Sequence, residues 1–177
     1  MVLNLFLTTY IIARKSPCKQ GLDLAILLDQ SWSVSETSLQ ALLKTLLPSF
    51  LGMIGVSKRK THVGLITFSS NSHFEFNFAK SNFQALPMLK AKISNMEGKT
   101  TFKTRIDHGL LSVRKELFTK RAGDRKNKQN VLLVFTDGRP YPPADVLPFN
   151  ETIPPLDRKS TRLNSRHLKL SRMPSSA

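Results

Sequence analysis

Apolar and polar residues alternate along the chain in blocks that predict buried strands between amphipathic helices. Residues 21–28, apart from Asp23, and residues 131–135 are apolar runs of strand length, as expected for strands that helices cover on both faces. In residues 61–69, successive side chains alternate between two sets, one for each face of a strand, and this pattern predicts a further strand. In residues 74–78 every second residue is Phe, which is typical of a half-exposed hairpin or edge strand.

Three segments between these strands have the spacing of helices. Ser33 or Ser35 can cap the first helix, and Pro48 is expected to bend it or break it locally. Its apolar positions repeat at helical spacing: Leu39, Leu42, Leu43, Leu46, Leu47 and Phe50. Residues 82–93 and 104–118 predict two more helices. Strands that alternate with helices predict an α/β fold with a doubly wound, mostly parallel, Rossmann-like sheet and one antiparallel edge strand.

Oxygen-bearing side chains follow two of the predicted strands. Asp29, Ser31 and Ser33 come directly after the first strand, and Asp137 comes at the end of the strand predicted at residues 131–135, after Thr136. Ligands of open α/β sheets bind at the carboxyl ends of strands, so the two carboxylates share one crevice if their strands are neighbours. Carboxylates, hydroxyls and water suit Mg²⁺ or Mn²⁺ rather than zinc. The structural alternative is a set of helix caps, because Asp and Ser often cap the helix after a strand.

With Thr104 at the start of an amphipathic segment, these residues resemble the metal-ion-dependent adhesion site of von Willebrand factor type A domains. That family includes integrin inserted domains and many extracellular-matrix modules. The resemblance implies that an acidic residue of a protein partner, such as a collagen, completes the shell of the bound cation. It covers about residues 18–156 and implies the following metal ligands: Asp29, Ser31, Ser33, Thr104 and Asp137.

Two positions of this pattern leave alternatives open. Thr100 and Thr101 compete with Thr104 for the metal role, and Thr104 is preferred because its spacing to Gly109 matches the family. Trp32 stands inside the metal loop, where the family often has Gly. It is interpreted as part of the rim of a partner-binding surface, and the alternative is that it shields the loop.

Length and charge divide the chain into three parts. A chain of 177 residues with 40% apolar content can bury one core, which predicts a single domain. Residues 157–177 resemble the translation of a widely used sequencing adapter, and a genuine basic, Ser-rich tail is the alternative. Without the six Lys/Arg residues and the one Asp of this segment, the formal net charge falls from +15 to +10. Residues 18–156 are therefore expected to hold the domain.

Residues 1–17 are a candidate signal or leader segment. Their apolar stretch is shorter than the roughly 20 residues of a membrane-spanning helix, so no stable membrane insertion is expected. Cys18 is the only cysteine, and an unpaired cysteine in a secreted protein indicates a partner elsewhere. No apolar strand follows Asp137. We therefore expect an extracellular chain that ends inside its domain, with residues 131–135 as an exposed, aggregation-prone sheet edge.

Two other functions compete with metal-dependent adhesion. The basic residues 58–60 and 120–128 favour a sulfated glycosaminoglycan, rather than nucleic acid, as an additional or alternative partner. An enzyme with Asp29 as a phosphotransferase nucleophile would require a second acid two residues later, where Ser31 stands. A Gly-rich phosphate loop and a nucleophile elbow are also missing from the sequence. The sequence thus predicts a binding protein and not an enzyme.

Overall fold

A single mixed sheet organises the chain. The computed structural model describes residues 8–11, 21–137, 140–142, 146–147 and 152. Its five strands lie in the order β1-β5-β2-β3-β4. Their bounds are Thr8–Ile11 for β1, Leu22–Asp29 for β2, His62–Phe68 for β3, Ser72–Phe76 for β4 and Gln129–Thr136 for β5. The central strand β2 is parallel to both of its neighbours, β3 and β5, and β4 runs antiparallel to β3. The predicted fold class is confirmed.

Strand β1 is the feature of the sheet that the sequence pattern did not predict. It pairs antiparallel with β5, from Thr8 opposite Thr136 to Ile11 opposite Leu133. The expectation that residues 131–135 form an open sheet edge is therefore wrong for the residues that β1 covers. The four residues of β1 belong to the predicted leader segment, whose other residues lie outside the described part of the chain. Cys18, the adapter-like tail and the boundaries of the three predicted parts also lie outside it.

The helix after β2 runs from Glu36 to Met53 in three pieces: α1 (Glu36–Ala41), a π-helical segment (Leu42–Leu46) and α2 (Leu47–Met53). Ser35 caps it, because its hydroxyl accepts a hydrogen bond from the Ser38 amide at 3.1 Å. Pro48 lies in the first turn of α2 and has no amide hydrogen to donate. The Leu47 amide donates to the Leu42 carbonyl, five residues back. The predicted disturbance at Pro48 is thus a widened turn rather than a break.

The remaining helices agree with the predicted segments to within a few residues. Residues 82–93 form a short 3₁₀ helix (Ser81–Gln84) followed by α3 (Leu86–Ser94). Residues 104–118 form α4 (Ile106–Ser112) and a second π-helical segment (Val113–Leu117). A 3₁₀ turn at Lys120–Ala122 leads towards β5. Both predicted helices are therefore shorter as α-helices than the sequence pattern indicates.

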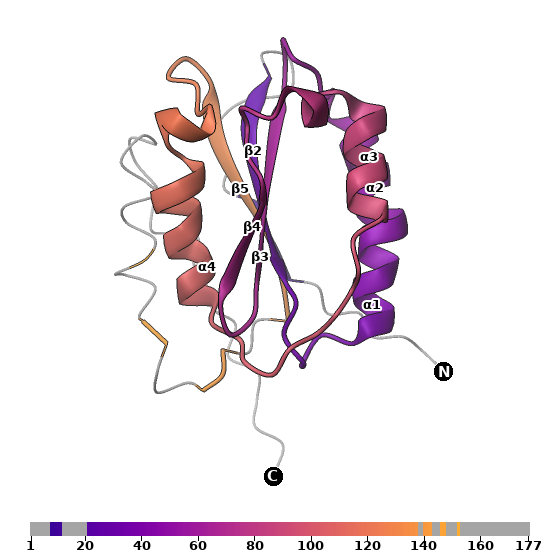
Figure 1. Cartoon of the computed structure of the whole chain (residues 1–177), viewed down its shortest axis with the longest axis vertical. Coiled ribbons are helices and arrows are strands. Elements are labelled where there is room, and N and C mark those ends of the chain that lie inside the picture. Colours follow the sequence, from indigo (N-terminus) through magenta and orange to yellow (C-terminus); the bar gives the residue numbers. More distant parts are fainter. Residues whose placement is uncertain (1–7, 12–20, 138–139, 143–145, 148–151, 153–177) are drawn as a thin grey trace.

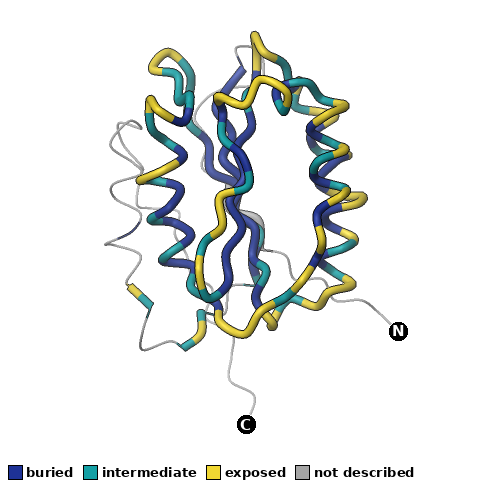
Figure 2. Tube along the Cα trace, viewed as in Figure 1, coloured by how far each residue is buried: buried dark blue, intermediate teal, exposed yellow. Residues whose placement is uncertain are grey.

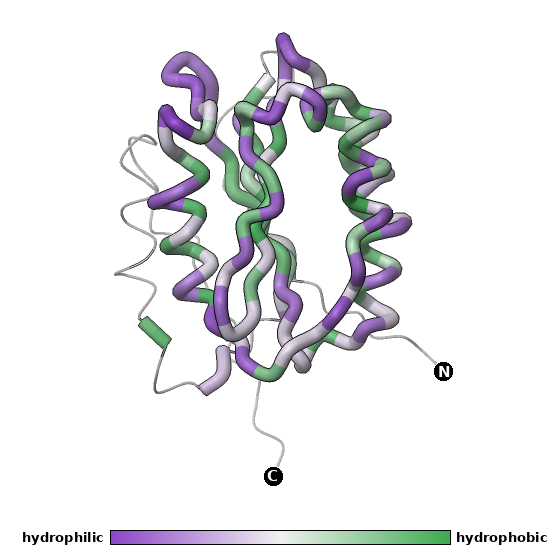
Figure 3. The backbone as a smooth tube through the Cα atoms, viewed as in Figure 1, coloured by the Kyte–Doolittle hydropathy of each residue, from purple (hydrophilic) through white to green (hydrophobic). Residues whose placement is uncertain are grey.

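Helices cover both faces of the sheet, α4 on one face and α1, α2 and α3 on the other (Figure 1). Alternate residues of β2 enter two separate cores. Leu24, Ile26 and Leu28 belong to the core under α1 to α3, whereas Ala25 and Leu27 belong to the core under α4. Strands β2, β3 and β5 are accordingly buried along most of their length, β4 is half-exposed, and the other exposed residues lie in the loops and on the outer sides of the helices (Figure 2). Hydrophobic residues follow the same division (Figure 3).

We predict opposite effects of one substitution at two helical glycines. A Cβ at Gly109 in α4 would lie 2.9 Å from Leu27 Cδ1 and 3.1 Å from Phe68 Cγ, both in the core. A Cβ at Gly52 in α2 would meet only the flexible end of Lys90, at 3.1 Å. Because Ala is the better helix former, Gly52→Ala should raise the free energy of unfolding by up to about 1 kcal/mol. Gly109→Ala should lower it by about 1–3 kcal/mol through overpacking.

Urea unfolding of both variants and the parent chain measures the two changes. Equal stabilisation by both substitutions would show that α4 does not approach the sheet as closely as the structure indicates.

Candidate metal centre

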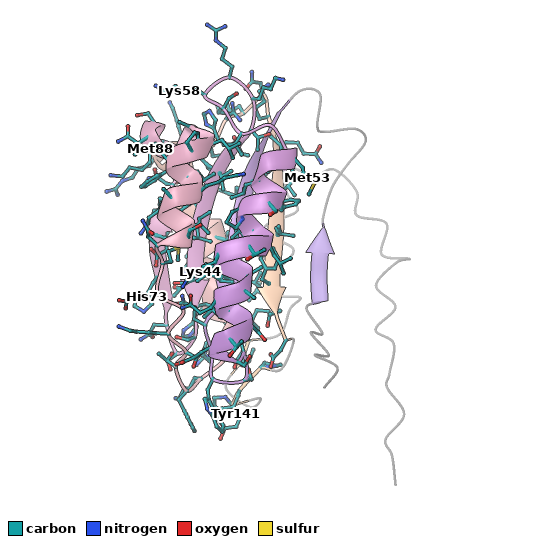
Figure 4. All side chains as sticks on the ribbon, turned by 90° about the vertical axis from the view of Figure 1, so that its right-hand side faces the viewer. Lys44, Met53, Lys58, His73, Met88 and Tyr141 are labelled. Atoms are coloured by element: carbon teal, nitrogen blue, oxygen red, sulfur yellow. The ribbon has the colours of Figure 1, made fainter. Side chains whose placement is uncertain are left out.

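The candidate ligands lie at the carboxyl ends of neighbouring parallel strands. Asp29 is the last residue of β2, and Asp137 follows Thr136, the last residue of β5. Because β2 and β5 pair in parallel, their carboxyl ends meet at the same edge of the sheet. The sequence predicts that the two carboxylates share one crevice if their strands are neighbours, and β2 and β5 are neighbours. The edge lies near Tyr141, at the opposite end of the molecule from Lys58 (Figure 4).

Hydrogen bonds fold the first loop around the buried Asp29 carboxylate. The Ser31 amide donates to Oδ1 at 2.8 Å, and the Thr136 hydroxyl donates to Oδ2 at 2.6 Å. The hydroxyl oxygens of Ser31 and Ser33 lie 3.0 Å apart. Ser31 is buried and Ser33 is exposed. The Asp-x-Ser-x-Ser spacing thus brings one carboxylate and two hydroxyls together within a single turn of chain.

The electrostatics of Asp29 connect it to Asp137. Burial raises the pKa of the Asp29 carboxyl, and the negative charge of Asp137 raises it further. Hydrogen bonds from Ser31 and Thr136 act in the opposite direction but do not cancel the rise. A buried carboxylate that faces a second carboxylate is costly to ionise without a counter-ion. The donor set of two carboxylates with adjacent hydroxyls therefore suits a hard divalent cation.

Thr104 reaches the same edge through main-chain hydrogen bonds. Its amide donates to the Tyr141 carbonyl at 3.0 Å, and the Tyr141 amide returns a bond of 3.2 Å. The next residue, Arg105, donates its amide to the carbonyl of Ser69, just beyond β3, at 2.8 Å. Thr101 pairs with the first loop by its backbone, since its carbonyl accepts the Trp32 amide at 2.6 Å. The Thr104 side chain is buried, whereas that of Thr101 is exposed.

A buried ion pair fixes the loop that carries Thr104. Arg105 donates through Nε to Asp107 Oδ1 at 3.0 Å and through Nη2 to Oδ2 at 2.8 Å. The Leu147 amide also donates to Oδ2, at 3.2 Å. Burial raises the pKa of Asp107, but these hydrogen bonds outweigh it and hold the pKa below its usual value. Sequence reasoning missed this pair, because an Arg and an Asp two residues apart carry no distinctive signal.

Three exposed aromatic side chains come from the segments that carry or pair with the candidate ligands; we call them the aromatic rim. Trp32 is 71% exposed, Phe102 64% and Tyr141 50%. The Trp32 and Phe102 rings stack with centroids 6.1 Å apart, and Tyr141 meets Phe102 edge-on at 5.8 Å. The sequence identified Trp32 from its place in the loop. Phe102 and Tyr141 were missed because they lie in polar and Pro-rich segments with no periodic pattern.

Two further findings concern the described residues as a whole. In this part of the chain, no three His, Cys, Asp or Glu side chains cluster in a way that would hold a metal ion. Among the described residues, the candidate ligands at this edge of the sheet are therefore two carboxylates and neighbouring hydroxyls. No described helix combines the length and apolar character that crossing a membrane requires.

The fold and site define a class of protein: a doubly wound α/β domain with oxygen-bearing side chains at the carboxyl ends of its central strands. The family model of the von Willebrand factor type A domain matches residues 23–153, and the chain belongs to that family.

Curated relatives agree with this assignment. The chain is 28% identical to mouse integrin alpha-M over 143 residues and 31% identical to mouse integrin alpha-X over 138 residues. These matches cover 79% and 77% of the chain and 11% of each integrin. Mouse matrilin-1 is 33% identical over 124 residues, which cover 66% of the chain and 23% of matrilin-1. The chain thus spans between about a tenth and a quarter of these relatives.

Solved structures share the fold. Proximal thread matrix protein 1 from the mussel byssus superimposes with a TM-score of 0.61 at 23% identity, covering 68% of this chain and 31% of that one. A second structure of the same protein has a TM-score of 0.55 at 20% identity. It is described as having a zinc-occupied MIDAS motif, the abbreviation for metal-ion-dependent adhesion site. It covers 62% of this chain and 28% of that one.

We predict that Arg105→Leu destabilises the domain more than the double variant Arg105→Leu/Asp107→Leu. The single variant leaves the Asp107 carboxylate buried without its cation, which costs about 3–5 kcal/mol, whereas removal of both charges is often close to neutral. Chemical denaturation of both variants measures the difference.

The same ion pair sets a pH dependence. Because the pKa of Asp107 is lowered in the folded state, its contribution to stability is present above the unfolded-state pKa and is lost as pH falls through the folded-state pKa.

In the denaturation experiment, an Arg105→Leu variant no less stable than Arg105→Leu/Asp107→Leu would contradict the role of the pair.

Proposed function

We propose that this chain is a metal-ion-dependent adhesion module that binds a protein partner through a divalent cation at the sheet edge. The observation that carries this proposal is the buried Asp29 carboxylate, held by Ser31 and Thr136 and exposed to the charge of Asp137. A cation would offset the repulsion between the two carboxylates. The membership of the chain in the von Willebrand factor type A family supports the same role.

The ligands of the proposed ion are the five residues that the sequence suggested: Asp29, Ser31, Ser33, Thr104 and Asp137. All five would coordinate the ion through side-chain oxygen atoms, which favours Mg²⁺ or Mn²⁺. The mussel thread protein has been described with zinc in its MIDAS motif, so zinc is the competitor to test. The chemistry that the ion supplies is Lewis-acid binding of a carboxylate.

The proposed partner offers a Glu or Asp side chain to that ion. Two protein carboxylates balance the charge of a divalent cation, so a third carboxylate from the partner can complete the shell without a large excess of negative charge. A matrix protein such as a collagen is the class of partner we propose, and the proposed location is extracellular. The similarity to matrilin-1 and to a thread matrix protein supports this choice.

The proposed role is binding rather than catalysis. An aspartate-based phosphotransferase would need an acid where Ser31 stands, and the Ser31 hydroxyl instead lies 3.0 Å from that of Ser33. The Asp29 oxygens both accept hydrogen bonds, as befits a fixed ligand.

We predict that Asp29→Asn abolishes Mg²⁺ and Mn²⁺ binding while the fold survives. The substitution keeps the shape of the side chain but removes a formal charge and one anionic ligand. In the parent chain, Mg²⁺ at 100 times its dissociation constant should raise the free energy of unfolding by about 2.7 kcal/mol. The variant should gain nothing from the metal. Titration calorimetry and thermal melting, with and without EDTA, measure both effects.

Glu36→Gln is the matched control, because Glu36 is an exposed acid in the first turn of α1, outside the proposed ligand set. It should bind metal as the parent chain does. Undiminished Mg²⁺ binding by Asp29→Asn would refute the proposed site, and binding of zinc alone would refute the proposed ion.

The aromatic rim is the proposed contact surface for the partner around the metal. Large exposed aromatics at the centre of an interface often account for 2 kcal/mol or more of binding free energy. Trp32→Ala should therefore weaken Mg²⁺-dependent binding to immobilised collagen by about tenfold or more, with unchanged affinity for the metal. Surface plasmon resonance measures the first quantity and calorimetry the second.

Met53→Ala is the control for this experiment, because Met53 is 78% exposed at the far end of α2. It should leave collagen binding unchanged. Equal binding by Trp32→Ala and the parent chain would exclude the rim as the contact surface. Failure of the parent chain to bind collagen would exclude that partner while leaving the calorimetric test of the metal site intact.

A further inference from the structure

Exposed basic side chains from four segments gather at the end of the sheet opposite the candidate metal centre. This end holds the amino ends of β2, β3 and β5 and the segment after β4, and Lys58 marks it in Figure 4, far from Tyr141. We call the group the basic pole. Its seven exposed members are Lys58, Arg59, Lys60, Lys80, Lys120, Arg121 and Lys126.

Arg125 joins two of these segments and fixes their backbones. Its Nη2 donates to the Lys60 carbonyl at 2.7 Å and to the Leu22 carbonyl at 3.1 Å. Its amide and its Nε each donate to the Asp23 carboxylate, at 2.8 Å. Residues 58–60 and 120–126, which are about sixty positions apart in the sequence, are thereby held side by side.

A second junction brings Lys80 to the same place. The Ala79 amide donates to the Ala122 carbonyl at 2.9 Å. Gly123, with a φ of +88°, allows this close approach, because a Cβ there would lie 2.6 Å from the Ala79 nitrogen. Lys80 therefore lies next to the turn that carries Lys120 and Arg121.

Little negative charge balances the pole. The Asp23 carboxylate is buried and already bonded to Arg125. Within the described part of the chain, the other acids nearby are Asp124, which is half-buried, and the exposed Glu116. Among the described residues, none of the seven cations of the pole belongs to a salt bridge. A group of like charges on a fixed backbone produces a positive field that attracts polyanions.

We propose that the basic pole binds a sulfated polysaccharide, independently of any metal at the opposite end. The pole offers cations spaced along a surface, which suits the regular charges of an extended sulfated chain. Single-stranded nucleic acid is the less suitable polyanion, because residues 57–61 and 119–128 contain no aromatic side chain on which a base could stack, and Phe74 is the one exposed aromatic residue described beside Arg121. The proposal stands or falls separately from the metal site.

Binding of the full chain to immobilised heparin, measured against NaCl concentration, tests the proposal. Lys58→Ala/Arg59→Ala and Lys120→Ala/Arg121→Ala should each weaken binding by about tenfold or more, and should lower its salt dependence, because fewer counterions are released. The control Lys44→Ala/Lys103→Ala removes the same charge from exposed positions away from the pole. It should bind heparin as the parent chain does, and EDTA should change nothing.

Competition experiments identify the chemistry that the pole recognises. Heparin should compete for the immobilised heparin, and chemically desulfated heparin should not. Equal weakening by the control and the pole variants would overturn the proposal, because binding would then reflect net charge alone. Stronger competition by duplex DNA than by heparin of equal total charge would overturn it in favour of nucleic acid. All variants retain residues 157–177, so charges in that segment cannot explain a difference between them.

Discussion

The burial of β2 is the constraint on which the rest of the structure depends. This strand pairs in parallel with β3 and β5 and contacts helices on both faces, so nearly all its residues must be apolar. Its carboxyl end is the first place where the chain can leave the sheet and present polar groups. Asp29 stands at that point, still buried, and its charge must be balanced by neighbouring hydrogen bonds and by whatever approaches from solvent.

The other end of the same strand meets the same difficulty in a different way. Asp23 is also buried, but Arg125 supplies a permanent cation and two hydrogen bonds to its carboxylate. The two acids of β2 thus differ in how they are neutralised. Asp23 has a partner within the chain, and Asp29 is held by neutral donors beside another acid. This contrast is the strongest physical reason to expect an external cation at one end and none at the other.

Periodicity allowed most of the fold and part of the candidate site to be predicted. The apolar runs located β2 and β5, and the Asp-x-Ser-x-Ser spacing placed Asp29, Ser31 and Ser33 at one edge. Strand β1 could not be predicted because its pairing with β5 is a long-range contact that leaves no local pattern. Phe102 and Tyr141 of the aromatic rim were missed for the same reason, since loops bring them to Trp32.

The eight residues of β2 also set the spacing between the two ends of the molecule. At about 3.3 Å per residue, the amino and carboxyl ends of β2 are roughly 26 Å apart. Electrostatic interactions in physiological salt decay over a Debye length of about 8 Å, so little of the positive potential at one end reaches the other. The strand therefore acts as an electrostatic spacer, and the surroundings of Asp29 and Asp137 feel little of the positive potential of the basic pole.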